Sequence, residues 1–113
     1  MSQITTHVLD TTQGKPAAGV IIVLEELTKE NIWIKKGQGE TNSDGRLPNL
    51  LSNDVQLISG TYRLVFDTAA YFKRLNIQSF YPSVSICFEV TDQTHYHVPL
   101  LLNPYGYSTY RGS

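Results

Sequence analysis

The chain has 113 residues, which fits one domain, and 41% of them are hydrophobic, which is enough for a buried core. A net charge of −1 excludes the basic surface of a nucleic-acid-binding protein and a polybasic membrane patch. The single cysteine, Cys87, excludes an intramolecular disulfide. No signal-peptide pattern opens the chain, so we expect one domain over residues 1–113 in the cytoplasm, or in the periplasm or a peroxisome if a targeting segment was removed.

The first half of the chain is typical of short strands separated by turn residues. Residues 12–16 and 42–45 are rich in turn-forming residue types and are expected to end strands. The segment that begins at Val20 opens with five apolar residues in a row, which indicates burial on both faces. We expect strands at residues 4–10, 20–28 and 32–39, followed by a short strand or loop at 47–51.

The middle of the second half predicts two strands and one helix. Apolar and polar side chains alternate through residues 61–67 and again through 83–90, which is the period of a strand. Residues 68–75 break this alternation. This segment has a candidate N-cap at its start, Asp67 or Thr68, contains two alanines and has basic residues in its last turn. It therefore predicts a short helix.

The last two strands are expected at residues 95–102 and 105–111. The tight connection at Asn103 and Pro104 favours an antiparallel pair. The sequence therefore predicts an all-β protein, a two-sheet β-sandwich of seven or eight strands with one short helix.

Three histidines are the first candidates for chemistry. Strand periodicity places His7 on one face of its strand, and His95 and His97 together on one face of theirs. The last two could offer a pair of imidazoles to zinc. However, Cys87 is the only thiol and Asp92 falls in the preceding turn, so we expect no metal site and no metal cofactor.

Two other kinds of site find little support in the sequence. No serine has the surrounding glycines of a nucleophile elbow, which argues against a Ser-His-Asp triad. The glycines at residues 37–39 end a strand instead of preceding a helix, which argues against a phosphate-binding loop. Cys87 alternates with apolar residues in a strand, so we expect a packed or partly exposed thiol and not a nucleophile.

The C-terminus is the most specific feature. Chain ends usually fray, yet aromatic and β-branched residues continue to the end here and are followed by Arg-Gly-Ser. Residues 95–113, which end in Tyr-Arg-Gly-Ser, closely resemble the C-terminus of the transthyretin-related 5-hydroxyisourate hydrolases. Transthyretin, the hormone carrier on the same fold, lacks this ending. Residues 4–10 with 14–17, and residues 41–46, resemble the other two signatures of that family.

The resemblance implies a transthyretin-like sandwich that assembles as a homotetramer, a dimer of dimers with sites at the dimer–dimer interface. The implied reaction is hydrolytic opening of 5-hydroxyisourate to 2-oxo-4-hydroxy-4-carboxy-5-ureidoimidazoline in urate degradation. It is the cleavage of a cyclic amide and needs no cofactor. The alternative is a transthyretin-like protein that binds a small aromatic ligand without catalysis, and a third possibility is an accessory β-sandwich module.

The resemblance also implies the site residues. A neutral imidazole with a pKa near ~6.5 can take a proton from water, and His7 or His97 would be this base; the sequence leaves the choice open. The guanidinium of Arg46 would stabilise the developing oxyanion or clamp the substrate. The catalytic residues implied are His7, Arg46, His97 and Ser113, and the substrate-binding residues are His7, Arg46, Tyr110, Arg111 and Gly112.

The C-terminal motif has its own implied roles. Tyr110 would bind the edge of the substrate ring, and Arg111 with the Ser113 terminus would orient the imidazoles. Strand periodicity puts Ser108, Tyr110 and Gly112 on one face, where they could border the same channel as the histidines.

Overall fold

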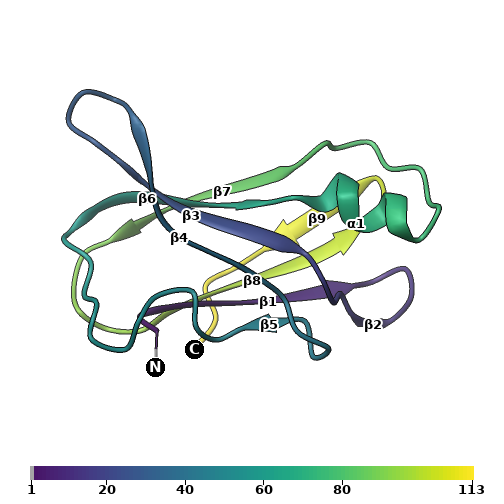
Figure 1. The fold of residues 1–113 in the computed structure, drawn as a ribbon, viewed down its shortest axis with the longest axis horizontal. Helices are drawn as coiled ribbons and strands as arrows, with labels where there is room; N and C mark the ends of the chain where they lie inside the picture. Colours follow the sequence, from purple (N-terminus) through teal and green to yellow (C-terminus); the bar gives the residue numbers. More distant parts are fainter. Residues whose placement is uncertain (1) are drawn as a thin grey trace.

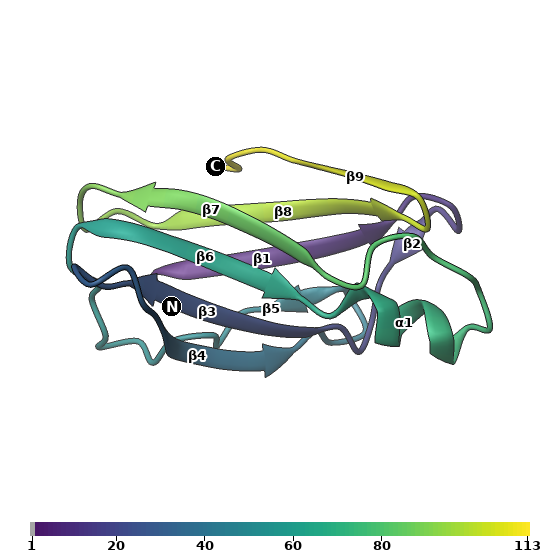
Figure 2. The ribbon, with the colours of Figure 1, turned by 90° about the horizontal axis from the view of Figure 1, so that it is seen from above.

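The computed structural model describes residues 2–113, which form two β-sheets packed face to face (Figures 1 and 2). The five-stranded sheet has the order β2-β1-β8-β9, with β5 also paired to β1, and the four-stranded sheet has the order β4-β3-β6-β7. The elements are β1 (Ile4–Asp10), β2 (Lys15–Pro16), β3 (Ile21–Leu27), β4 (Trp33–Glu40), β5 (Arg46–Leu47), β6 (Gly60–Phe66), α1 (Thr68–Arg74), β7 (Val84–Val90), β8 (Tyr96–Asn103) and β9 (Gly106–Thr109). The predicted sandwich with one short helix is confirmed.

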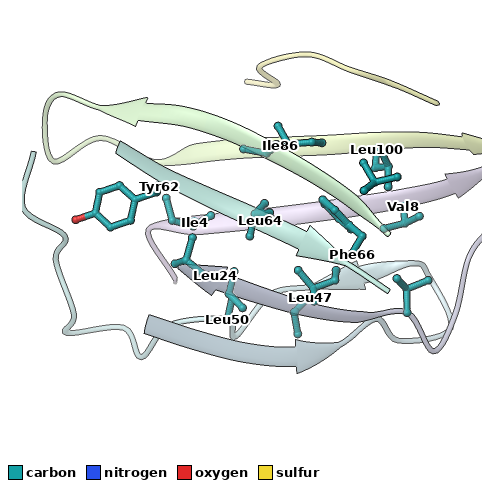
Figure 3. Close-up of a cluster of buried hydrophobic side chains, with 14 of the residues drawn as sticks. Ile4, Val8, Leu24, Leu47, Leu50, Tyr62, Leu64, Phe66, Ile86 and Leu100 are labelled. Carbon is teal, nitrogen blue, oxygen red and sulfur yellow. The ribbon is translucent and has the colours of Figure 1, made fainter. Parts of the chain in front are cut away.

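The core lies between the two sheets and is built from alternate residues of each strand. Figure 3 shows Ile4 and Val8 of β1 facing Leu64 and Phe66 of β6 across this space. All four side chains are fully buried. Because side chains alternate across a strand, Thr5, His7 and Leu9 of β1 point to the outer face of the five-stranded sheet.

Two pairings bring distant parts of the chain together on that outer face. Strands β1 and β8 are parallel neighbours, with Thr5 opposite His97. The two-residue strand β5 pairs with the other edge of β1 and sets Arg46 opposite His7. The N-terminal strand therefore carries candidate residues from the middle and the end of the chain on its two sides.

The helix forms as predicted, with Asp67 as its N-cap: the Asp67 carboxylate accepts a hydrogen bond from the Ala70 backbone N–H at 3.2 Å. The described helix is too short to cross a membrane. Residues 15–16, expected in a turn, instead form β2, because the turn after β1 folds the chain back against Leu9. Residues 46–47 form β5, while 48–51 are not in a strand.

The last strand is shorter than the predicted 105–111. It stops at Thr109, and the register of β8 and β9 then brings Pro99 opposite Tyr110. Proline has no N–H to donate, so the ladder is interrupted there. It resumes two residue pairs later as a single bridge between His97 and Gly112, whose backbone N–H donates to the His97 carbonyl at 2.8 Å.

Candidate active site

A pocket of about 310 Å³ opens on the outer face of the five-stranded sheet. Strand β1, the segment that begins with β5, the start of β8 and the chain terminus each contribute to it. It brings together three of the predicted catalytic residues, Arg46, His97 and Ser113. The complete lining consists of Thr5, Thr6, Arg46, Pro48, His95, His97 and Ser113.

The turn before β5 positions Arg46. The Asn42 side-chain oxygen accepts hydrogen bonds from the backbone N–H groups of Asp44 at 2.9 Å and Arg46 at 3.1 Å. Gly45 has a φ of +73°, and a Cβ there would collide with the Val8 carbonyl oxygen. The predicted turn at residues 42–45 is thus fixed by its own side chains and by β1, and it holds Arg46 at the pocket.

The imidazole of His97 is held on two sides. Its Nδ1 lies 2.8 Å from the Thr5 hydroxyl. On the other edge, a Cβ on Gly112 would come within 2.6 Å of the ring carbon Cδ2, so the ring occupies space that only a glycine leaves free. Of the two ring nitrogens of His97, only Nδ1 has a hydrogen-bond partner within residues 2–113. Its other nitrogen, Nε2, is therefore available to a molecule in the pocket.

Both predicted catalytic imidazoles are held in the neutral form. Burial lowers the pKa of His97, and the charge of Arg46 lowers it further, with His95 and His7 adding to the effect. Burial and then Arg46 also lower the pKa of His7, although Asp44 acts in the opposite direction. At neutral pH these imidazoles carry a free lone pair, which a general base requires.

His7 itself lies beside the pocket and not in its lining. It is half-buried on the outer face of β1, between Arg46 of β5 and Pro99 of β8. Between the two histidines that the sequence left as candidates, the geometry of the single chain therefore favours His97 as the group that reaches a bound molecule.

The residues of the terminal motif separate in space. Ser113 lines the pocket and Gly112 packs against His97. The guanidinium of Arg111 instead lies over the ring of the buried Tyr96, 4.3 Å from its centre. Tyr110 is 59% exposed and borders a different depression next to β7. The single chain does not bring Tyr110 or Arg111 into the pocket, so their contact with substrate stays a prediction for an assembled protein.

Sequence reasoning gave no catalytic or binding role to four residues of the pocket, Thr5, Thr6, Pro48 and His95. Strand periodicity already placed Thr5 on the face of His7, and His95 on the face of His97. What the sequence lacked was the parallel pairing of β1 with β8, which sets Thr5 against both histidines. Among residues 2–113, no group of three His, Cys, Asp or Glu side chains is arranged to hold a metal ion.

Comparisons with known proteins agree on one family. Residues 4–112 match the model of the HIUase/Transthyretin family. The chain is 47% identical over 114 residues to the 5-hydroxyisourate hydrolase of Mus musculus, covering 99% of this chain and 96% of the relative.

Two solved structures share the fold. The 5-hydroxyisourate hydrolase of Klebsiella pneumoniae superposes with a TM-score of 0.85 and 34% identity, covering 97% of this chain and 98% of the other. Sea bream transthyretin in complex with thyroxine gives a TM-score of 0.92 with 28% identity, covering 98% and 95%. The fold is therefore common to a hydrolase and to a transthyretin that binds thyroxine.

Proposed function

The chain belongs to the HIUase/transthyretin family, and we propose that its pocket is the site at which 5-hydroxyisourate is hydrolysed. The activity is the hydrolytic opening of 5-hydroxyisourate in urate degradation. The observation that carries the assignment to this pocket is the meeting of His97, Arg46 and Ser113, from three distant parts of the chain, around one cavity.

In the proposed reaction, Nε2 of His97 takes a proton from a water molecule as the water oxygen bonds to the carbonyl carbon of the cyclic amide. A positioned base of this kind contributes roughly 10²- to 10⁴-fold to a rate. The carbonyl oxygen gains negative charge in this step. The Arg46 guanidinium, which stays protonated at any working pH, stabilises that charge.

The second half of the reaction returns the proton. The carbon–nitrogen bond of the amide breaks, and the departing nitrogen takes the proton that His97 received. The new carboxylic acid ionises to a carboxylate. His7 lies beside the pocket, opposite Arg46 in the pairing of β1 with β5. The C-terminal Ser113 closes one side of the cavity.

We propose that the protein assembles as a D2 homotetramer, a dimer of dimers in which the pockets line the channel between the dimers. The outer face of the five-stranded sheet carries the half-buried Leu9 and Leu101 beside the open pocket. Tyr107 and Tyr110 of the C-terminal segment are 43% and 59% exposed. Apolar surface of this kind favours a partner, and dihedral tetramers are common among closed assemblies. Sedimentation as a monomer with full activity at micromolar concentration would contradict both the assembly and a site shared between subunits.

The test of the function follows the absorbance of freshly generated 5-hydroxyisourate with and without the protein. The substrate decays unaided, so the uncatalysed decay is measured beside it. We expect the wild-type protein to accelerate the loss, and His97→Asn to remove most of the acceleration while the fold is kept. Binding of a small aromatic ligand without acceleration would instead support a carrier, as the likeness to transthyretin would allow.

A further inference from the structure

The hydroxyl of Thr5 connects two histidines. Its Oγ1 lies 2.8 Å from Nδ1 of His97 and 2.8 Å from Nε2 of His95. The side chains differ in exposure, since His97 is half-buried at the pocket and His95 is exposed. The three groups therefore form a continuous hydrogen-bonded chain that runs from half-buried His97 to exposed His95, the more solvent-exposed of the two histidines that line the pocket.

The direction of this chain fixes the tautomer of His97. A hydroxyl has one proton to donate, so it cannot donate to both ring nitrogens, and one of them must donate to it. If His97 donates from Nδ1 to Thr5 and Thr5 donates to His95, then Nε2 of His97 holds a lone pair. If the direction is reversed, Nε2 of His97 carries the proton instead. The first direction makes His97 a base and the second makes it an acid.

We propose that Thr5 and His95 are positioning residues for the hydrolysis, which hold His97 in its base tautomer and carry its positive charge outward when it accepts a proton. This inference rests on the proposed function. Thr5 acts through its hydroxyl, and His95 acts as the solvent-side end of the chain.

Each proton in this step has a donor and an acceptor. As Nε2 of His97 takes a proton from water, Nδ1 passes its proton to Oγ1 of Thr5, and Thr5 passes its hydroxyl proton to Nε2 of His95. His97 is then neutral with a proton on Nε2, and His95 is an imidazolium. When His97 gives its Nε2 proton to the departing nitrogen, His95 returns a proton through Thr5 to Nδ1. The cycle restores every group.

The charges around His97 explain why moving the positive charge is favourable. The groups that face this imidazole are the Arg46 guanidinium from β5, the His7 ring from β1 and the His95 ring from the residue just before β8. Gly112, which packs on it from the C-terminal segment, has no charged side chain. A cation on half-buried His97 would be repelled by the nearby Arg46 guanidinium. The same charge on exposed His95 is hydrated.

Variants at Thr5 test this chain. Thr5→Val removes the hydroxyl and keeps the branched shape, whereas Thr5→Ser keeps the hydroxyl. We expect Thr5→Val to lower kcat roughly tenfold to hundredfold, because His97 loses its fixed tautomer, with a smaller change in KM. Thr5→Ser should keep kcat within about threefold. Thr61→Val, on β6 of the other sheet, removes a threonine hydroxyl far from the pocket and should leave kcat unchanged. Equal activity in Thr5→Val and wild type would overturn the proposal.

A spectroscopic measurement separates this proposal from the function itself. Long-range ¹H–¹⁵N spectra report the tautomer of His97 without any substrate. We expect the Nδ1–H form in the wild type and in Thr5→Ser, and a mixture of both forms in Thr5→Val. An Nε2–H form in the wild type would overturn the proposal, and so would a tautomer unchanged by Thr5→Val. These outcomes can be decided even if the protein failed to hydrolyse 5-hydroxyisourate.

His95 is tested by chemical rescue. His95→Ala should lower kcat, and free imidazole added to the buffer should restore part of the loss, because it can accept the proton from Thr5. His95→Ala also covers the case in which Thr5→Val folds poorly, since the exposed His95 is not part of the core. Full activity of His95→Ala without imidazole, or a loss that imidazole leaves untouched, would contradict a role in proton transfer.

Discussion

The polar groups on the two faces of strand β1 differ in burial and in hydrogen bonding. On the inner face, Thr6 and Asp10 are each only 1% exposed, and their side chains are hydrogen-bonded within the protein, although Thr6 also borders the pocket. On the outer face, Thr5 and His7 are half-buried; Thr5 lines the pocket and His7 lies beside it. Adjacent residues of one strand thus supply either stability or chemistry, depending on the face to which they point.

On the inner face, the buried carboxylate of Asp10 is stabilised by hydrogen bonds. Its carboxylate accepts hydrogen bonds from the Tyr71 hydroxyl at 2.7 Å, from the side chain of Gln13 at 2.8 Å, and from the backbone N–H groups of Thr12 and Gln13 at 3.0 and 3.1 Å. Burial alone would raise the pKa of Asp10, but these hydrogen bonds outweigh it and the net effect lowers the pKa. Burial, and then the same contact, raise the pKa of Tyr71. The carboxylate oxygens of Asp10 are therefore all used in hydrogen bonds within the protein and are not available to a ligand.

The outer face differs because part of its hydrogen-bonding capacity is left unused. Nδ1 of His97 is bound to Thr5, while Nε2 is free to meet a molecule in the pocket. Arg46 lines the same cavity and is exposed. Residues that hold such capacity at a cavity are candidates for chemistry, whereas saturated polar residues are candidates for structure.

The largest expected effect comes from removing residues 110–113. The deletion removes the Ser113 side of the pocket and the Gly112 contact on the His97 ring, while every buried core side chain lies before it in the sequence. We expect catalysis to be abolished and the sandwich to remain folded, as measured by turnover and circular dichroism.

A short C-terminal extension is the matched variant for this deletion. It keeps all the side chains and moves the terminal carboxylate away from the pocket, so it should also impair turnover without unfolding the protein. Near-normal turnover of the deletion variant would refute the assignment of the terminal motif to the active site.

The next effect, on the order of a hundredfold in kcat/KM, is expected for Arg46→Lys. Lysine keeps the charge but loses the planar fork that meets an oxyanion, and removal of one such donor typically costs this much. The thermal midpoint should barely move, because the Arg46 side chain is exposed. Parallel loss of fold and activity would instead make Arg46 a structural residue of its turn.

The fold could be predicted further than the site. Alternation of apolar side chains located most strands and assigned each residue to a face, because that period is local to the strand. The partner of a strand is not local. Nothing in residues 4–10 alone specifies parallel pairing with β8, so the contact of Thr5 with His97 could not be predicted. The direction of Arg111 toward Tyr96 depends on the path of the chain after β9 ends at Thr109, which strand periodicity does not specify either.

A smaller effect, on stability and not on rate, is expected for Asp10→Asn. The amide would turn a donor toward groups that already donate, and a buried group left unsatisfied in this way costs about 2 kcal/mol in free energy of unfolding. Denaturant unfolding should show this loss, while kcat of the folded protein stays near that of the wild type. Asp54→Asn, at an exposed position, is the control and should change neither quantity. A large loss of kcat in folded Asp10→Asn would show that the two faces of β1 are coupled.

The smallest effect concerns pH and completes the comparison. Burial and then the charge of Arg46 lower the pKa of His97 below the usual 6.5, and the pKa of His7 is lowered by the same two causes in the same order. Below pH 6.5 the unfolded chain therefore binds more protons at these residues than the folded protein does. Their contribution to stability is complete above the unfolded pKa and declines as the pH falls from there through the folded values. Activity that needs neutral imidazoles should fall only once the pH drops below 6.5.

Arg46→Met removes the charge and should move the acid limb of kcat/KM to higher pH, since a protonated imidazole is then less disfavoured. The pKa of the buried Asp10 carboxylate is lowered by a different cause, its hydrogen bonds, and not by a neighbouring cation. Arg46→Met should therefore leave the titration of Asp10 unchanged. Measuring kcat/KM against pH for the wild type and Arg46→Met checks the first expectation. An acid limb that stays in place would mean that burial alone holds these imidazoles neutral and that Arg46 acts only on the substrate.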